Sequence, residues 1–297
     1  MQQSSIYRPR THARTTRHAI RGVNYNVREW GDPAAPILVY LHGWADTGAT
    51  FQFVVDELRS DWRIIAPDWR GFGDSQGSVA GYWFADYLAD LDRLLAIYSP
   101  DAAVPLVAHS MGANVAGLYA GAMPSRVSAF INMEGFGLPD AQPAEAPERY
   151  RQWLSAIRTG SAFSRYPDFA ALAARIESRN PRLSRARAEF VARCWGVQQG
   201  TEVVLRADPL HRLPNPVLYR REEAEACWRA VRAPVLLVAG SDSDIVQRMG
   251  GSADAALAGL PFPNASRSLI DGAGHRLHFD APAELADLIT TFLARAL

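Results

Sequence analysis

Lysine is absent from this sequence of 297 residues, so all 31 basic residues are arginine. We attribute this to a compositional bias of the genome and derive no function from it. The 31 acidic residues balance the arginines and leave a formal net charge of +0 at pH 7. The chain therefore lacks the basic excess that is typical of nucleic-acid-binding proteins, and we expect no nucleic-acid partner.

Cysteine is also scarce, with only Cys194 and Cys227. Two isolated cysteines provide neither a disulfide framework nor the ligand spacing of a metal site, and they suit a reducing compartment. No apolar run approaches the roughly 18 residues of a membrane helix, and the N-terminus has no apolar signal-peptide core. We expect a cytoplasmic protein without membrane insertion, metal or cofactor.

The N-terminal region carries several arginines and no acidic residue between positions 8 and 28. Such a stretch is compatible with a transit peptide. However, apolar and polar residues alternate in HAIRGVNYNVREWG, and Arg21-Gly22 suits a tight turn. This pattern favours an edge β-hairpin, which we predict here.

Short apolar runs alternate with helical patterns through most of the chain. We predict strands at 36–41, 62–66, 104–108, 127–133, 234–239 and 267–270, and helices at 50–58, 82–98, 252–260 and 282–296. Strands that are apolar throughout and alternate with helices are typical of a parallel sheet covered on both faces. The predicted fold class is therefore α/β.

The alternation breaks over residues 137–230, which are rich in alanine, arginine and glutamate. This stretch contains helix-like segments at 148–158, 168–178 and 184–194, and it has no clear strand. We predict a helical cap that is inserted into one α/β core, with the core formed by residues 1–136 and 231–297.

Ser110 stands at a conspicuous position in the stretch VPLVAHSMGANVAG, which spans residues 104–117. An apolar strand precedes it, and small residues follow it at the start of a predicted helix. A bend this sharp strains its central residue and is tolerated when the neighbouring residues are small. The bend lifts the hydroxyl clear of the sheet, beside the free amides of the helix N-terminus. This is one way to present a nucleophile.

Four stretches then appear in a telling order: LHGW at 41–44, DWRGFGDS at 68–75, AHSMG at 108–112 and GAGHRLHFDAP at 272–282. With these stretches the chain resembles the α/β-hydrolase superfamily over nearly its whole length. Ala108 stands where the family motif G-x-S-x-G has its first glycine, which is a mild departure because the position requires only a small residue.

The resemblance implies that Ser110 is a nucleophile and His275 its general base, since a serine hydroxyl needs a base within hydrogen-bond reach. His278 is the alternative base, but we interpret it as an ordinary residue at the start of the last helical region. The resemblance also implies that the backbone amides of Trp44 and Met111 form an oxyanion hole.

Three further residues are expected around a substrate: His42, Trp44 and Phe136. For His42 we favour a structural part in shaping the turn that aims the Trp44 amide. The charged residues of 68–75 are expected to support that turn rather than to take part in chemistry.

The identity of the third catalytic residue, a carboxylate, stays open between two places. In much of the superfamily this acid lies three residues after a glycine like Gly240, where this chain has Ser243, flanked by Asp242 and Asp244. Other members place it one strand after the nucleophile, where this chain has Glu134. A carboxylate at a buried strand end needs a partner, and an imidazolium would be one. We favour Glu134 over the two aspartates.

A serine nucleophile implies an acyl-enzyme, so the resemblance implies hydrolysis of a small or medium ester or related acyl substrate, as in carboxylesterases. Carbon–carbon bond hydrolases and acyltransferases use the same scaffold and triad and remain alternatives. A small-molecule receptor with a slow triad is a third one. The expected partner is a small-molecule substrate. A homo-oligomer is compatible with the sequence, but no feature indicates one.

Overall fold

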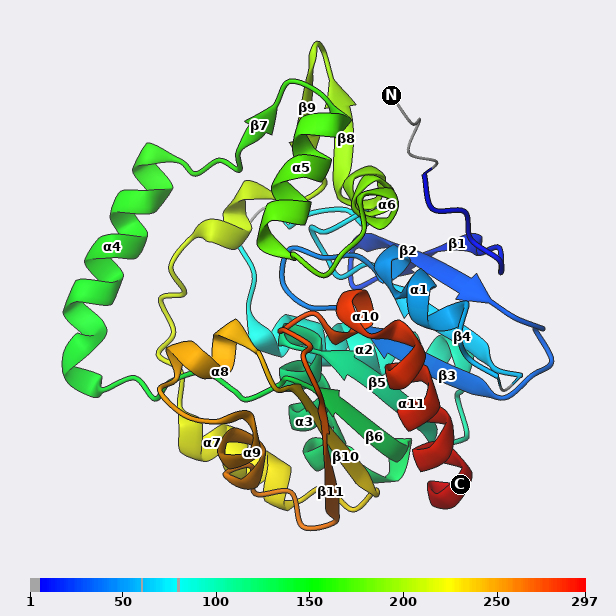
Figure 1. The fold of residues 1–297 in the computed structure, drawn as a ribbon. Coiled ribbons are helices and arrows are strands. Elements are labelled where there is room, and N and C mark those ends of the chain that lie inside the picture. Colours follow the sequence, from blue (N-terminus) through cyan, green and yellow to red (C-terminus); the bar gives the residue numbers. More distant parts are fainter. Residues whose placement is uncertain (1–5, 60, 79–80) are drawn as a thin grey trace.

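The computed structural model describes residues 6–59, 61–78 and 81–297, and a central eight-stranded sheet organises them (Figure 1). Its spatial order is β1-β2-β4-β3-β5-β6-β10-β11. The strands are β1 (Arg14–Ile20), β2 (Val23–Trp30), β3 (Ile37–Leu41), β4 (Arg63–Pro67), β5 (Val104–His109), β6 (Val127–Met133), β10 (Val235–Gly240) and β11 (Ala265–Ile270). Neighbouring strands from β4 to β11 pair in parallel, which confirms the predicted α/β class.

The N-terminal hairpin is also confirmed. Strands β1 and β2 pair antiparallel from Arg14↔Glu29 to Ile20↔Val23. The two turn residues, Arg21 and Gly22, both have positive φ angles of 50° and 78°. Two consecutive positive φ angles match the twist of a hairpin, and glycine adopts such an angle without strain.

Helices cover both faces of the sheet, as the sequence predicts (Figure 1). One face packs under α1 (Gln52–Val55) and α11 (Pro282–Ala296), and the other under α2 (Phe84–Tyr98), α3 (Met111–Ala122) and α9 (Ala253–Ala258). The predicted helix at 50–58 is shorter than expected, because a 3₁₀ turn (Gly48–Phe51) leads into the single turn of α1. The other short helices are α8 (Asp244–Arg248) and α10 (Leu277–Asp280).

The segment between β6 and β10 contains the three predicted helices as α4 (Ala146–Thr159), α5 (Phe169–Arg179) and α6 (Arg185–Trp195). The expectation of no strand here is wrong. Three short strands, β7 (Arg165–Tyr166), β8 (Gly196–Gln199) and β9 (Glu202–Leu205), form a separate antiparallel sheet. Strands of two to four residues are too short to show an alternating pattern in the sequence.

The last helix of this segment, α7 (Arg221–Arg229), belongs to the central layers by its packing. It lies against α3, and its Ala224 and Trp228 are buried in the same core cluster as α2 and α3. Helices α5 and α6 instead share a separate cluster with β9. We therefore propose that the inserted part ends before Arg221 rather than at residue 230.

Helix α4 stands apart from the rest of the molecule, at the left edge of Figure 1. None of its residues is buried, and Leu154 and Ile157 are about half exposed.

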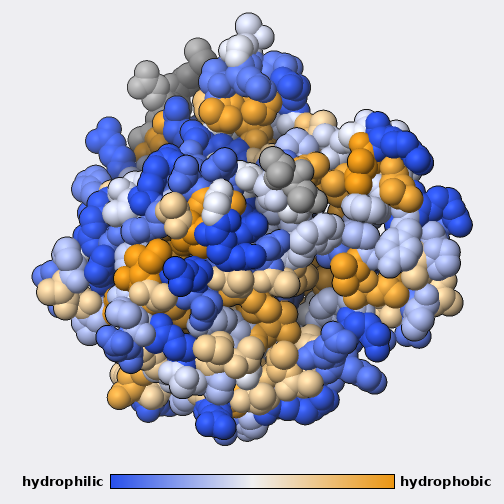
Figure 2. All heavy atoms as spheres, turned by 180° about the vertical axis from the view of Figure 1, so that it is seen from behind, coloured by the Kyte–Doolittle hydropathy of each residue, from blue (hydrophilic) through white to orange (hydrophobic). Residues whose placement is uncertain are grey.

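On the face opposite to that view, hydrophobic side chains gather in several patches among hydrophilic ones (Figure 2). No helix in the described part of the chain is long and apolar enough to cross a membrane.

Candidate active site

Ser110 occupies a strained turn between β5 and α3. Its φ and ψ angles are 51° and −115°, outside the regions that non-glycine residues usually adopt. Gly112 permits this turn, because a Cβ atom there would lie 2.4 Å from the carbonyl oxygen of Leu41 and 2.6 Å from that of His42. The helix start thus packs directly against the end of β3. Strain of this kind costs about 1–3 kcal/mol and is concentrated at functional sites.

Glu134 follows β6 directly and is almost completely buried. Its φ angle of 58° turns the side chain toward β10 and the loop after it. Oε1 accepts a hydrogen bond from the Gly240 amide at 2.9 Å. Oε2 accepts one from the Ser243 hydroxyl at 2.6 Å and one from Nδ1 of His275 at 2.6 Å. Three donors therefore solvate a buried carboxylate that water does not reach.

His275 lies on the loop between β11 and α10 and connects Glu134 to Ser110. A carboxylate can only accept a hydrogen bond, so Nδ1 of His275 carries the ring proton and donates it to Glu134. Nε2 is therefore free to accept a hydrogen bond from the Ser110 hydroxyl at 3.1 Å. The backbone of His275 is held as well, since Nε2 of His109 donates to its carbonyl oxygen at 2.9 Å. The three residues form one continuous chain of hydrogen bonds.

The two aspartates that compete with Glu134 in the sequence lie elsewhere. Asp242 and Asp244 are exposed and pair with Arg182 and Arg248, respectively. Neither forms a hydrogen bond with His275 among the contacts of the described residues. The geometry therefore favours Glu134, as the sequence analysis does.

The turn at His42-Gly43-Trp44 lies against the strained serine. A Cβ atom on Gly43 would come within 2.8 Å of Nδ1 of His109 and 3.2 Å of Cβ of Ser110. His42 is completely buried, its Nδ1 donates to the Gly43 carbonyl oxygen, and its Nε2 accepts from the Trp69 amide. Burial lowers the pKa of His42, which keeps the ring neutral.

Two cavities meet at Ser110. The first, here the apolar cavity, has a volume of about 400 Å³ and is walled by Tyr82, Phe84, Tyr87, Phe136, Leu138, Leu210, His211 and Leu213, among others. The second, here the charged cavity, has a volume of about 710 Å³, and its charged residues are Arg179, Arg182, Arg248, Arg276, Asp242, Asp244 and Asp280. Ser110, Trp44, Ile245 and His275 border both.

The three residues that were expected to contact a substrate differ in their position relative to the two cavities. Trp44 is about half exposed and borders both cavities, and Phe136 lies in the wall of the apolar cavity. His42 is completely buried and lines neither cavity, which favours the structural part over a substrate contact. Both ring nitrogens of His42 form hydrogen bonds with the backbone, and these bonds fix the turn before Trp44.

A buried polar cluster beneath the site escaped the sequence analysis. His278, in the first turn of α10, is completely buried and contacts Asp46 at 3.2 Å between Nε2 and Oδ2. Asp46 Oδ1 also accepts from the indole of Trp195 at 2.7 Å. Burial alone would raise the pKa of Asp46, but the contacts with His278, His42 and Trp195 hold it below its usual range. The charge of Asp46 is therefore satisfied by protein donors, and it ties α6 to the loop after β3.

Ligand atoms of Asp46, His109 and His278 lie within 4.8 Å of one another, which makes them the metal-like group to consider. The Asp46 carboxylate is already saturated with hydrogen bonds. Nδ1 of His109 faces Gly43 so closely that even a Cβ atom there would be only 2.8 Å away. Nδ1 of His109 and Nδ1 of His278 are buried without a hydrogen-bond partner among the described residues, but the carboxylate that would join them is engaged by protein donors, and we assign no metal to the cluster.

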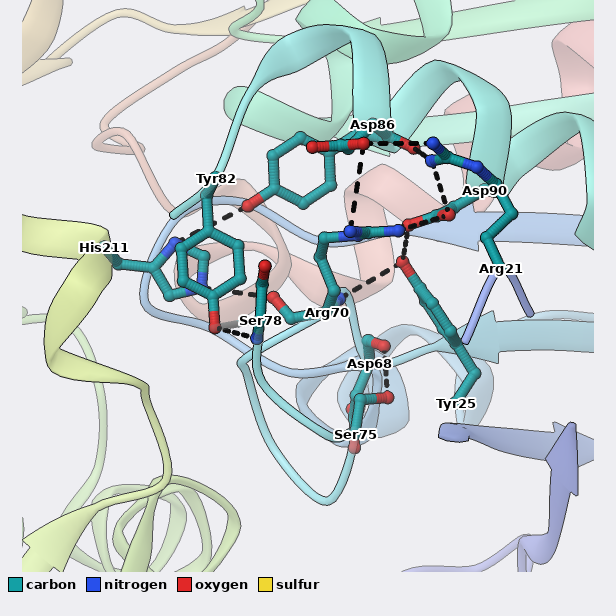
Figure 3. Close-up of polar contacts among 11 residues, drawn as sticks. Arg21, Tyr25, Asp68, Arg70, Ser75, Ser78, Tyr82, Asp86, Asp90 and His211 are labelled. Atoms are coloured by element: carbon teal, nitrogen blue, oxygen red, sulfur yellow. Dashed lines mark hydrogen bonds and ion pairs between the residues drawn. The ribbon is translucent and has the colours of Figure 1, made fainter. Parts of the chain in front are cut away.

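Residues 68–75 hold the turns around the site in place. Asp68 accepts hydrogen bonds from the amides of Gly48 and Asp74. Arg70 lies between Asp86, Asp90 and Tyr25 (Figure 3), with Nε of Arg70 2.5 Å from Oδ2 of Asp90. This agrees with the supporting part predicted for these charged residues.

His211 joins the same loop to the segment before α7. Its ring is stacked between Phe72 and Tyr82, with ring centroids 3.7 Å and 3.5 Å apart. Its Nε2 donates to the carbonyl oxygen of Arg70 at 3.1 Å (Figure 3). Burial lowers the pKa of His211 to about 3. The ring is thus neutral in the folded protein and forms part of the wall of the apolar cavity.

This histidine should make the stability of the protein fall in mild acid. The unfolded chain protonates it near its ordinary pKa of about 6.5, so its contribution is complete above pH 6.5 and declines as the pH falls toward 3. Between pH 7 and 4.5 the free energy of unfolding should drop by about 1–2 kcal/mol more in the wild type than in His211→Phe, which keeps the stacking but does not titrate. Urea unfolding at the two pH values measures this. The exposed His12→Phe is the control, and equal drops in wild type and His211→Phe would contradict the prediction.

Comparison with known proteins agrees with this arrangement. The model of the alpha/beta hydrolase fold family matches residues 36–282, so the chain belongs to this family. It is 25% identical over 276 residues to a serine hydrolase-like protein of Danio rerio, covering 89% of this chain and 83% of the relative. It is 29% identical over 234 residues to the 3-hydroxybutyrate-oligomer hydrolase of Cupriavidus necator, covering 74% and 77%.

Among solved structures, the thioesterase domain from the curacin biosynthetic pathway superposes with a TM-score of 0.83 at 25% identity, covering 94% of this chain and 99% of that domain. These similar proteins are hydrolases by name, and this chain shares their fold family.

Proposed function

We propose that the protein is a serine hydrolase that cleaves a small or medium ester or thioester through an acyl-enzyme. The observation that carries this proposal is the chain of hydrogen bonds from Ser110 through His275 to Glu134, with distances of 3.1 Å and 2.6 Å. It presents a hydroxyl to a base whose tautomer is held by a carboxylate, which is the arrangement that activates serine nucleophiles.

In the first half-reaction, Nε2 of His275 takes the Ser110 proton while Oγ bonds to the carbonyl carbon of the substrate. The resulting imidazolium is stabilised by Glu134, and the proton then passes to the leaving alcohol or thiol as its bond to the acyl group breaks. In the second half-reaction, water loses a proton to His275 as it adds to the acyl carbon, and the imidazolium then returns that proton to Oγ of Ser110 as the bond between Oγ and the acyl group breaks and the acid leaves.

The negative charge on the tetrahedral intermediate needs donors that are already in place. We propose the amides of Met111 and Trp44 for this purpose. Met111 begins α3, where amides have no partner within the helix. The close packing of Gly43 and Gly112 against the neighbouring turns supports a position of both amides next to Ser110. Loss of one such donor typically lowers turnover about 10²- to 10³-fold.

The ester or thioester class is supported by the nucleophile and by the comparisons. A serine forms an acyl-enzyme, and two of the similar proteins are named as an oligomer hydrolase for 3-hydroxybutyrate and as a thioesterase domain. The apolar cavity of about 400 Å³ suits a small or medium acyl chain.

Reaction with a fluorophosphonate probe tests the proposal directly. We expect a single adduct on Ser110, mapped by mass spectrometry, in the wild type and in Ser178→Ala, which removes an exposed hydroxyl on α5. Ser110→Ala should give no adduct and no hydrolysis of 4-nitrophenyl butyrate. If the folded wild type is not labelled, the serine is not activated, and a receptor with a slow triad becomes the better description.

A further inference from the structure

The charged cavity has an unbalanced set of ion pairs beside Ser110. Arg182 pairs with Asp242 and lies 4.0 Å from Asp280. Arg248 pairs with Asp244 at 2.7 Å. These contacts engage the three carboxylates of the cavity and two of its four arginines. The other two, Arg179 and Arg276, have no carboxylate within ion-pair distance in the part of the chain that the structure describes.

Of these two arginines, Arg276 lies next to the candidate catalytic histidine in the sequence. It directly follows His275 and is only partly accessible, so its charge is largely withdrawn from bulk water. Among the described residues, its one side-chain hydrogen bond is a long one, from Nη1 to Oδ1 of Asn180 at 3.4 Å. Burial lowers its pKa below the usual arginine value, yet a guanidinium stays charged at neutral pH.

A partly buried guanidinium with no carboxylate at ion-pair distance among the described residues has N–H donors left to bind an anion. The guanidinium also lies over the ring of Trp195, 5.5 Å from its centroid. This contact orients the guanidinium, but it leaves the planar fork of N–H groups available. Such a fork matches the two oxygens of a carboxylate or phosphate.

We propose that Arg276, assisted by Arg179, binds an anionic group of the substrate, a carboxylate or a phosphate. The other half of that substrate is apolar and lies in the apolar cavity, since the two cavities meet at Ser110 and His275. The substrate is then an ester or thioester with one apolar and one anionic end. The position of the scissile bond at Ser110 rests on the proposed hydrolase function. The binding of an anion by Arg276 does not depend on that function.

Binding to the Ser110→Ala variant tests the anion site without any turnover. Isothermal titration calorimetry would compare two matched pairs of ligands. The first pair is the 4-nitrophenyl monoester of glutaric acid and 4-nitrophenyl pentanoate, which differ by a carboxylate in the acyl part. The second is S-butanoyl pantetheine 4′-phosphate and S-butanoyl pantetheine, which differ by a phosphate in the leaving group.

We expect the anionic member of one pair to bind about 10- to 100-fold more tightly, the range of a hydrogen-bonded charge pair. The pair that shows the preference identifies the anion and its side of the scissile bond. Arg276→Gln in the same background should abolish the preference, and Arg276→Lys should keep part of it. Arg248→Gln is the matched control and should retain it, because Asp244 neutralises Arg248.

Equal binding within both pairs, or a preference that survives in a folded Arg276→Gln variant, would overturn the anion site. A purely structural part for Arg276 on Trp195 would lower thermal stability without changing the ratio within a pair. Hydrolysis of 4-nitrophenyl pentanoate by the wild type is measured separately, so failure of the proposed hydrolase function is recognised independently.

Discussion

Glu134→Gln should lower kcat/KM for a simple neutral ester by about 10³- to 10⁴-fold, the effect of replacing the acid of a serine triad with its amide. The three hydrogen bonds described above for this side chain are all donated to it, by Gly240, Ser243 and His275. An amide has only one accepting atom, so its NH₂ group must face at least one of these donors.

The consequence reaches the nucleophile through the tautomer of His275. If the amide nitrogen of the substituted side chain donates to Nδ1, the ring proton moves to Nε2, which then faces the Ser110 hydroxyl and no longer accepts its proton. Because glutamine has nearly the same shape as glutamate, the fold should be preserved. The loss should therefore appear in kcat rather than in KM, and the rate of fluorophosphonate labelling should fall with it.

The competing aspartates provide the controls for this experiment. Asp242→Asn and Asp244→Asn each remove one partner of an exposed ion pair, which contributes about 1 kcal/mol at most. Each should change kcat/KM for the neutral ester by less than about fivefold. If either variant loses more activity than Glu134→Gln, the catalytic acid is that aspartate and our assignment is wrong.

Much of this site could be anticipated because its residues follow strand ends. A mostly apolar run such as 127–133 is typical of a buried strand in an α/β chain, and β6 has these bounds. The residues directly after such strands meet at one edge of a parallel sheet. Ser110 and Glu134 could therefore be brought together on paper without knowledge of any side-chain contact.

Contacts between distant segments could not be anticipated in this way. Nothing in the local sequence of Ser243 indicates that its hydroxyl reaches Glu134, 109 positions earlier. The same holds for His109, whose ring donates to the backbone of His275. The unpaired state of Arg276 is also a property of the assembled cavity, because it depends on which arginines the nearby carboxylates engage.

The short strands and α7 escaped prediction for a different reason. β7, β8 and β9 are too short for a periodic pattern. Helix α7 has the polar, arginine- and glutamate-rich composition of the inserted segment, yet Ala224 and Trp228 attach it to α3. The composition of such a helix reflects mainly its solvent-exposed face. The position of the helix in the fold is set by the few side chains that it buries.

Moving the acid to residue 243 should restore part of the activity that is lost when Glu134 is removed. Oε2 of Glu134 lies 2.6 Å from both the Ser243 hydroxyl and Nδ1 of His275, so a longer side chain at 243 can reach the imidazole. Residue 243 is also the position at which the family resemblance expects an acid. Ser243 caps the N-terminus of α8, and aspartate is an equally good capping residue.

The variant to make is Glu134→Gly/Ser243→Asp. Glycine suits position 134 because the backbone there has a φ angle of 58°. We expect the double variant to be about 10- to 100-fold more active on a neutral ester than Glu134→Gly, which corresponds to partial recovery of a triad that is worth about 10³- to 10⁴-fold. The activity assay with 4-nitrophenyl butyrate measures this.

Two further variants make the result specific to the geometry. Glu134→Gly/Ser241→Asp places the new carboxylate on an exposed side chain two residues away and should recover nothing. Ser243→Asp alone sets two carboxylates against each other at a buried position, so one of them must take up a proton, and the melting temperature should fall. If the double variant folds but is no more active than Glu134→Gly, the acid cannot act from residue 243. That result would mean that His275 requires a carboxylate in the orientation that the backbone of Glu134 imposes.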